Sequence, residues 1–178
     1  YCDGGTTTGL NSYFLLPWNC EDSSGHPELA AVFRQSDIFI ASSGDIFITN
    51  ESYHMYKSTD GGATWSFLSL GSGIDAYTRK VAEDSSGNLY FATKGGIYKS
   101  SDAGASFTRF TSADNGLAHD STFSVVLNST GTIYAGTNSG LSISTDGGTS
   151  FITKTAADGL AHSQCYDLVV DSADNVFC

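Results

Sequence analysis

Two sequence markers return along this chain at nearly the same interval. The first is an Asp within three similar phrases, "KSTDGGATWSFL" (57–68), "KSSDAGASFTRF" (99–110) and "ISTDGGTSFITK" (143–154). A damaged copy of the phrase, "YCDGGTTT", occupies residues 1–8. The second marker is a turn residue that recurs at spacings of 43, 44 and 43 residues, namely Gly44, Gly87, Gly131 and Asp174. Two independent markers that share a period near 43 residues indicate tandem structural repeats.

Each period reads as four short strands. In the third repeat the segments "FSVVLN", "TIYAGT", "LSIST" and "SFITKT" are apolar or alternate with period two, and Gly-, Asn- and Asp-rich turns separate them. Residues 111–121 are too rich in Gly, Asp and Ser for more than a turn or one helical twist. Four antiparallel strands repeated every 40–50 residues predict an all-β fold, a β-propeller or propeller fragment of about four repeats.

The repeats divide the chain into one propeller region, residues 1–178. We expect blades at about 29–70, 71–115 and 116–160, partial blades at 161–178 and 1–15, and an irregular insertion at 9–30. The two partial blades could close a four-bladed ring. Four blades would be few for a ring, since the range is about four to eight, so we favour a piece of a longer propeller of about six to eight blades.

Composition indicates which partners and which cellular compartment suit the protein. The net charge is −11, and the 8 basic residues are scattered, so nucleic acids and anionic membranes are poor partners. No apolar run approaches the length that membrane insertion requires. Four cysteines without metal-type spacing, in a Gly- and Ser-rich chain, favour an exported protein with disulfides.

The cysteine pairing is less constrained. Cys2 and Cys20 flank an irregular segment and are the favoured pair, although Cys2 with Cys178 is an alternative. A Cys165–Cys178 bond is disfavoured, because Cys178 should oppose Leu168, and Cys165 lies three residues away on what should be the other face.

The repeated phrases fit the pattern Ser-x-Asp-x-Gly-x-Thr-Trp. This pattern resembles the Asp-box, or BNR repeat, of sialidases, family 74 xyloglucanases, sortilin-type receptors and photosystem assembly propellers. The matching positions are Ser58, Asp60, Gly62, Thr64 and Trp65; Ser100, Asp102, Gly104, Ser106 and Phe107; Ser144, Asp146, Gly148, Ser150 and Phe151; and, in the damaged copy, Asp3, Gly5 and Thr7. The resemblance implies a hairpin between the third and fourth strands, facing away from the substrate end. A structural role without cofactors is expected there, with a ligand or calcium contact as the alternative.

A second resemblance lies between the boxes. Residues 114–141, "DNGLAHDSTFSVVLNSTGTIYAGTNSGL", look like the two-component-regulator propeller repeat, and 157–178 repeat the first half. This resemblance implies a bacterial cell-surface, periplasmic or extracellular setting.

Candidate catalytic residues are few. His119 and His162 occupy the same slot of two "GLAH" motifs, and equivalent slots look alike because the repeats are copies. A sialidase needs three converging arginines, whereas this chain has only Arg34, Arg79 and Arg109. Arg109 directly follows a box, so we expect it near the box edge, opposite the substrate end. A hydrolase needs two opposed carboxylates. The candidates Asp37, Asp75, Asp120 and Asp167 show no obvious pair.

Aromatic residues suggest a binding surface instead. Candidates lie near blade starts, in the 9–30 segment and in the 50–56 insertion: Tyr77, Phe123, Tyr166, Tyr13, Phe14, Trp18 and Tyr53. Such side chains could stack on a sugar or on a partner protein, or could simply pack between blades. The sequence therefore predicts a non-enzymatic exported propeller that binds a protein partner in an interaction or assembly role. The alternative is a glycan-binding or glycan-cleaving domain.

Overall fold

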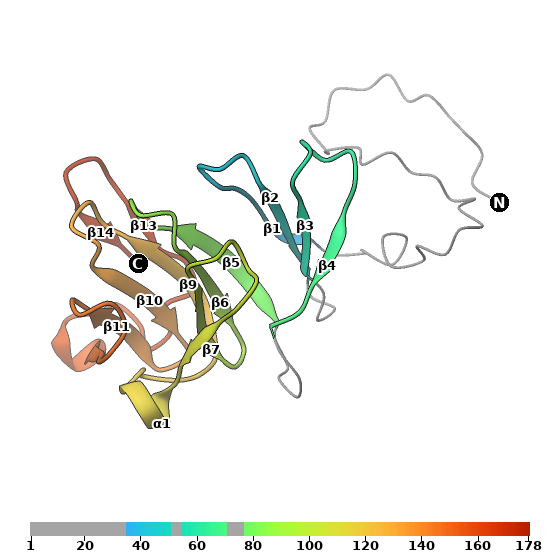
Figure 1. Cartoon of the computed structure of the whole chain (residues 1–178). Coiled ribbons are helices and arrows are strands. Elements are labelled where there is room, and N and C mark those ends of the chain that lie inside the picture. The colour runs from blue at the N-terminus through green and yellow to red at the C-terminus, as the bar shows by residue number, and fades with distance from the viewer. Residues whose placement is uncertain (1–34, 51–54, 71–76) are drawn as a thin grey trace, which may run out of the picture. The chain divides into compact units, whose positions relative to one another are not determined.

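The computed structural model describes residues 35–50, 55–70 and 77–178 of the chain. These residues form three four-stranded antiparallel sheets and one two-stranded sheet (Figure 1). Within the described ranges, the helical pieces are the single turn α1 (Ser112–Asn115) and the 3-10 turn η1 (Ala156–Asp158). The predicted all-β class with four-stranded antiparallel blades is confirmed.

The strands follow one another in simple meanders. Blade 1 contains β1 (Gln35–Ile40), β2 (Ile46–Asn50), β3 (Met55–Ser58) and β4 (Ser66–Leu68). Blade 2 contains β5 (Thr78–Glu83), β6 (Leu89–Thr93), β7 (Gly96–Ser100) and β8 (Thr108–Phe110). Blade 3 contains β9 (Thr122–Leu127), β10 (Ile133–Thr137), β11 (Gly140–Ser144) and β12 (Ile152–Lys154). Blade 4 is represented by the hairpin of β13 (Val169–Val170) and β14 (Val176–Phe177).

The turn between the first and second strands of each blade uses a left-handed residue. Gly44, Gly87 and Gly131 have φ angles of 89°, 81° and 81°, and Asp174 has 63° at the same position. Glycine reaches this region without steric cost, and Asp is one of the few other residues that tolerate it. The second sequence marker therefore records a backbone requirement of the hairpin.

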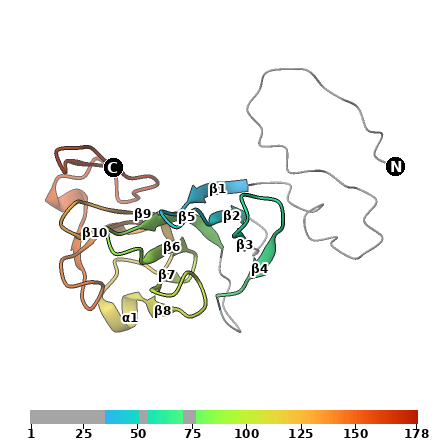
Figure 2. The same cartoon turned by 45° about the horizontal axis from the view of Figure 1, so that its top comes forward.

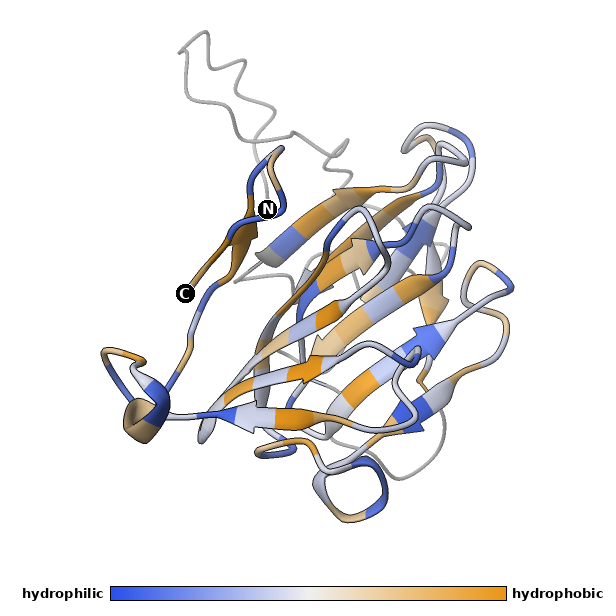
Figure 3. Ribbon diagram, turned by 90° about the vertical axis from the view of Figure 1, so that its left-hand side faces the viewer, coloured by the Kyte–Doolittle hydropathy of each residue, from blue (hydrophilic) through white to orange (hydrophobic). Residues whose placement is uncertain are grey.

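Successive blades pack through their apolar faces. First strands lie against one another, β1 against β5 and β5 against β9 (Figure 2). Between blades 1 and 2 the buried core contains Phe47, Met55, Leu70, Val81, Leu89, Phe91 and Tyr98. Between blades 2 and 3 it contains Tyr90, Ile97, Phe110, Leu117, Val125, Ile133 and Phe151. Hydrophobic residues accordingly concentrate on the strands, whereas many turns are hydrophilic (Figure 3). A lone four-stranded sheet could not bury both faces, so stacking supplies the core.

The first strands carry a bulge near their beginning. The pairing register shifts by one residue between Gln35 and Asp37, between Thr78 and Lys80, and at the equivalent place in β9 opposite Gly136 and Thr137. A bulge places two residues opposite one and so resets the alternation of side chains along the strand. The extra residue is Arg79 in blade 2 and Phe123 in blade 3.

Candidate binding surface at the blade-start end

The meander gives every blade two different ends. First strands begin, and fourth strands finish, at the blade-start end, which holds the connections 111–121 and 155–166. The opposite end, the box end, holds the turns between first and second strands. It also holds residues 58–65, 100–107 and 144–151, which we call the box turns.

Each box turn is hydrogen-bonded to itself. In blade 1 the Asp60 Oδ1 atom accepts from the Ser58 hydroxyl at 2.8 Å and from the Thr64 N–H at 2.9 Å, and Oδ2 accepts from the Thr64 hydroxyl at 2.6 Å. The Ser58 hydroxyl oxygen accepts from the Gly62 N–H at 2.8 Å, and the Trp65 indole donates to the Gly62 carbonyl. Blades 2 and 3 repeat the Asp and Ser contacts around Asp102 and Asp146.

These contacts fix the charge state of the box carboxylates. Hydrogen bonds from Thr64, then Ser58, lower the pKa of Asp60 to about 2. The matching serines lower the pKa of Asp102 and of Asp146 to about 2 as well. The carboxylates are therefore ionised at neutral pH, and local donors occupy their oxygens. The hydrogen bonds thus tie each box turn to itself.

The box turns also contact the preceding blade. A Cβ atom added at Gly148 would lie 2.4 Å from ring atoms of Phe110, and one added at Gly104 would lie 3.1 Å from Leu68. Phe110 and Leu68 end the fourth strands of the preceding blades. The box glycine is therefore needed both for its positive φ angle and for close packing between blades.

At the blade-start end, three side chains from consecutive blades form a stack. The Arg79 guanidinium lies over the Phe123 ring, with Cζ 4.5 Å from the ring centroid. The Phe123 and Tyr166 centroids are 4.8 Å apart, at an interplanar angle of 47°. Arg79 is held in place because its Nη1 donates to the Ser121 hydroxyl and to the Thr122 carbonyl. The Tyr166 side chain remains 61% exposed.

A polar row lies beside this stack, one residue further along each first strand. The Asp37 carboxylate accepts from the Val81 N–H at 3.1 Å, and the Ser124 hydroxyl oxygen accepts from the Leu168 N–H at 3.1 Å. Lys80 in blade 2 reaches Asp167 in blade 4, with Nζ 2.7 Å from Oδ1. Burial raises the pKa of Asp167, but hydrogen bonds from Lys80, the Leu168 N–H and Ser124 lower it more, so the net shift is downward.

The two "GLAH" histidines organise the loops that carry the stack. Nδ1 of His119 accepts from the Ser121 N–H at 2.8 Å, and Nδ1 of His162 accepts from the Gln164 N–H at 3.1 Å. The Gln164 amide in turn accepts from the Tyr166 hydroxyl at 2.6 Å. Among the described residues no group of three or more His, Cys, Asp or Glu side chains could hold a metal ion. Each histidine therefore acts as a local acceptor that shapes its loop.

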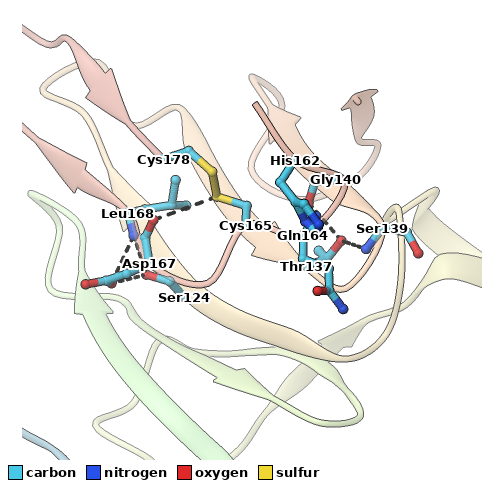
Figure 4. The surroundings of a disulfide bond; sticks show 10 residues. All are labelled: Ser124, Thr137, Ser139, Gly140, His162, Gln164, Cys165, Asp167, Leu168 and Cys178. Atoms are coloured by element: carbon cyan, nitrogen blue, oxygen red, sulfur yellow. Dashed lines mark hydrogen bonds between the residues drawn. A yellow bond between two sulfur atoms is a disulfide. The ribbon is translucent and has the colours of Figure 1, made fainter. Parts of the chain in front are cut away.

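The predicted exclusion of a Cys165–Cys178 bond is wrong. The two residues form a disulfide with a Cα–Cα distance of 5.8 Å, beside Leu168 and Asp167 (Figure 4). Val169 pairs with Phe177, so the register places Leu168 opposite Cys178, as expected. In blades 2 and 3 the first-strand bulge places residues three apart, such as Thr78 and Val81, on the same face. The equivalent residues Cys165 and Leu168 are both buried in one apolar cluster. The favoured pair, Cys2 and Cys20, lies outside the described residues.

The arginines do not gather into a sialidase-like triad in the part of the chain that the structure describes. Arg79 belongs to the stack, whereas the Nε of Arg109 donates to the Gly95 carbonyl at 2.7 Å. The expectation that Arg109 lies near the box end is wrong. Because β8 has only three residues, a side chain from its middle reaches the β6–β7 turn at the blade-start end. Arg34 lies outside the described residues.

The structure describes three of the predicted aromatic residues. Phe123 and Tyr166 come together, whereas Tyr77 is half-buried just before β5, where its carbonyl accepts from the Lys94 N–H. The remaining predicted residues lie outside the described ranges: Tyr13, Phe14, Trp18 and Tyr53, together with Asp3, Gly5 and Asp75. Of the other candidate carboxylates, Asp120 accepts from the Ser112 N–H at 2.6 Å.

Sequence reasoning missed Arg79 as a partner of the aromatics. The signal was present, because Arg79, Phe123 and Tyr166 each lie eight residues before the turn residue of their blade. Lys80, Ser124 and Asp167 each lie seven residues before it. Aligning the repeats position by position, instead of by motif, would have placed both rows side by side.

A protein-family model matches most of the chain. The family model described as the DUF6242 beta propeller domain matches residues 16–176. No curated protein is similar enough to count as a relative. Among the described residues, no helix is long and apolar enough to cross a membrane.

Solved structures share the fold at low sequence identity. The extracellular domain of BT3049 from B. thetaiotaomicron, named as a hybrid two component system, is similar with a TM-score of 0.70 and 14% identity, over 80% of this chain and 20% of that one. YCF48 bound to D1 peptide gives 0.57 and 17%, over 80% and 45%. An ancestral GH74 enzyme gives 0.54 and 20%, over 68% and 18%. The chain thus spans less than half of each of these structures, and the likeness establishes the propeller fold alone.

Proposed function

The chain belongs to the DUF6242 beta propeller domain family, and from this premise we propose that it is an exported, non-enzymatic module that binds a protein partner at its blade-start end. The stack of Arg79, Phe123 and Tyr166 carries the proposal. Aromatic and arginine side chains are enriched where proteins bind one another, and a handful of them supply most of the binding energy.

Hydrogen bonds already hold the side chains of this surface in place, which favours it as a binding site. The Arg79 guanidinium is anchored by two hydrogen bonds, and the Tyr166 hydroxyl is anchored by Gln164. Side chains that are already fixed lose little rotamer freedom on binding, which leaves more of the contact energy as affinity. The stack draws on three blades, so a partner that covers it would also hold the blades together.

The carboxylates near the stack favour binding over hydrolysis. Glycoside hydrolysis needs a general acid with a raised pKa opposite a second carboxylate. Asp167, the carboxylate beside Tyr166 in sequence, has a lowered pKa and an ion pair with Lys80. This arrangement suits a surface pair better than a proton donor.

An extracellular, periplasmic or cell-surface location is part of the proposal. The Cys165–Cys178 disulfide supports it, because such bonds persist in oxidising compartments. The extracellular domain of BT3049 has the same fold, which agrees with this setting.

Site-specific photo-crosslinking tests the proposal. A photoreactive phenylalanine replaces Tyr166 in one variant and Ser101, on a box turn, in a matched control. Each variant is irradiated with the envelope and secreted proteins of the source organism. We expect a discrete protein adduct from position 166 that position 101 does not give. Adducts from position 101 alone would contradict the proposal.

A glycan-directed function is the second candidate, because an exposed Tyr166 could also stack on a sugar ring and a GH74 enzyme shares the fold. A glycan array, with turnover assays on sialosides and β-glucans, separates the two candidates. Specific hydrolysis of any of these substrates would refute the non-enzymatic proposal.

A further inference from the structure

The box end has a cavity of about 340 Å³ between blades 2 and 3. Its lining includes Asn88, Lys99, Ser101, Thr108, Phe110 and Gly147. The cavity lies between two complete blades and on the opposite end from the stack, so it is independent of the function proposed above.

The preceding junction, between blades 1 and 2, has a lysine with two polar partners at the equivalent place. In blade 1, Lys57 lies over the Phe47 ring, with Nζ 5.6 Å from the centroid. The same Nζ is 2.7 Å from Asp45 Oδ2 in its own blade and 2.9 Å from the Ala103 carbonyl of the next blade. One ammonium group therefore joins a carboxylate to the neighbouring box turn.

In blade 2 the residue equivalent to Lys57 is Lys99, which lines the cavity, and Asn88 takes the position of Asp45. Lys99 lies over the Tyr90 ring, with Nζ 5.3 Å from the centroid, as Lys57 lies over Phe47. Gly147 stands where blade 2 has Ala103, and Asn88 stands where blade 1 has Asp45. The Asn88 amide is directed elsewhere, because its Nδ2 donates to Asp84 Oδ2 at 2.7 Å. Within the described residues, no carboxylate or hydrogen-bond acceptor pairs with the Lys99 ammonium group.

We propose that this cavity binds a small carboxylate ligand, whose carboxylate takes the place that Asp45 occupies at the preceding junction. Lys99 supplies the charge-assisted hydrogen bond, and the hydroxyls of Ser101 and Thr108 line the same space. Phe110, which is largely buried, is the apolar residue of the lining. The volume lies at the lower end of the range for small-molecule sites.

The surrounding charges limit the affinity. The net charge of −11 and the ionised Asp102 and Asp146 of the flanking box turns oppose the approach of an anion. Local donors already occupy the oxygens of both carboxylates, so neither competes directly for the Lys99 ammonium. We therefore expect weak binding, with a dissociation constant on the order of 1 mM.

Titration of the ¹⁵N-labelled chain tests the site. D-glucuronate and acetate are the carboxylate probes, and D-glucose is the neutral control. We expect saturable amide shifts at Thr108 and Gly147 with both carboxylates and none with glucose. Equal affinities for glucuronate and acetate would show that the carboxylate alone is recognised, whereas tighter glucuronate binding would show that the sugar ring contributes. Absence of saturable shifts with either carboxylate, or equal shifts with glucose, would overturn the proposal.

Two variants locate the binding group. Lys99→Gln should weaken carboxylate binding about tenfold or more, because the charged donor is lost. Lys94→Gln, at the other end of the same blade, should leave it unchanged. If Lys99→Gln binds as tightly as the natural chain, Lys99 is not the recognition group and the proposal fails.

A double substitution that conserves the net charge tests whether a carboxylate of the chain itself can occupy the site. The double substitution Asp84→Asn and Asn88→Asp places a carboxylate where blade 1 has Asp45. Asn at position 84 has a precedent in Asn128, whose Oδ1 accepts from turn N–H groups at the equivalent place in blade 3. We expect the swap to weaken ligand binding about tenfold, because the internal carboxylate competes for Lys99. Unchanged binding in the swapped chain would contradict the proposal.

Discussion

Adjacent glycines in the third box turn allow a direct test of blade packing. Gly147 and Gly148 have φ angles of 74° and 96°, so an alanine at either position is strained. A Cβ atom at Gly147 meets nothing within 4 Å, whereas one at Gly148 lies 2.4 Å from the Phe110 ring in the preceding blade. We expect Gly147→Ala to lower the free energy of unfolding by about 1–2 kcal/mol through backbone strain alone. Gly148→Ala should add an overpacking cost of about 1–3 kcal/mol.

Urea unfolding followed by circular dichroism measures both values. A second background, Phe110→Leu, reproduces the smaller side chain that Leu68 presents to Gly104 at the preceding junction. In that background the extra cost of Gly148→Ala should shrink by about half, since the aliphatic side chain can yield. Equal losses for the two alanine variants, or an undiminished loss in the Phe110→Leu background, would refute the claim that the box glycine is a packing position.

Three further predictions follow from the hydrogen bonds and the disulfide. The box carboxylates have folded pKa values of about 2, below the unfolded value of about 3.9, so they stabilise the fold above that value. The free energy of unfolding should therefore fall as the pH drops from about 4 to 2, and Asp102→Asn should make that fall shallower; an unchanged slope would argue against the box contacts. Replacing both Cys165 and Cys178 by Ser should lower the free energy of unfolding by about 3 kcal/mol in urea titrations, since the bond closes a 13-residue separation. Asp37→Ala should cost about 1–3 kcal/mol, because the Val81 N–H is left without its acceptor; a neutral effect would show that water replaces the carboxylate.

Repeat spacing made the fold predictable from the sequence. Each period carries one left-handed turn and one box, and both are local features that short motifs encode. The bulge was not predictable in the same way, because its extra residues, Arg79 and Phe123, share no residue type. It is set by the backbone pairing of first and second strands. The shared burial of Cys165 and Leu168 in one cluster was likewise not visible in the sequence alternation. The Lys80–Asp167 pair joins blades 2 and 4, so it depends on how the blades stack, which no single repeat records.

The sequence placed the box turns away from the binding end of the blades, but it did not show which side chains meet at the blade-start end. The box serines and aspartates bond within their own turns, so the box phrase describes its own structure. The blade-start end depends instead on side chains from three blades, which become neighbours only after stacking. The cavity beside Lys99 also lies between two blades, and its lining includes Asn88 at the position that Asp45 has in blade 1.

The central claim is that the blade-start stack, and not an arbitrary exposed aromatic, binds the partner. Its most direct test is the affinity of the crosslinked partner for Phe123→Ala and for Phe67→Ala, measured by titration calorimetry. Phe67 is 54% exposed on β4 and lies outside the stack. We predict that Phe123→Ala weakens binding on the order of tenfold or more, as loss of an interface anchor does, while Phe67→Ala changes it little. Equal affinities for the two variants and the natural chain would contradict the claim.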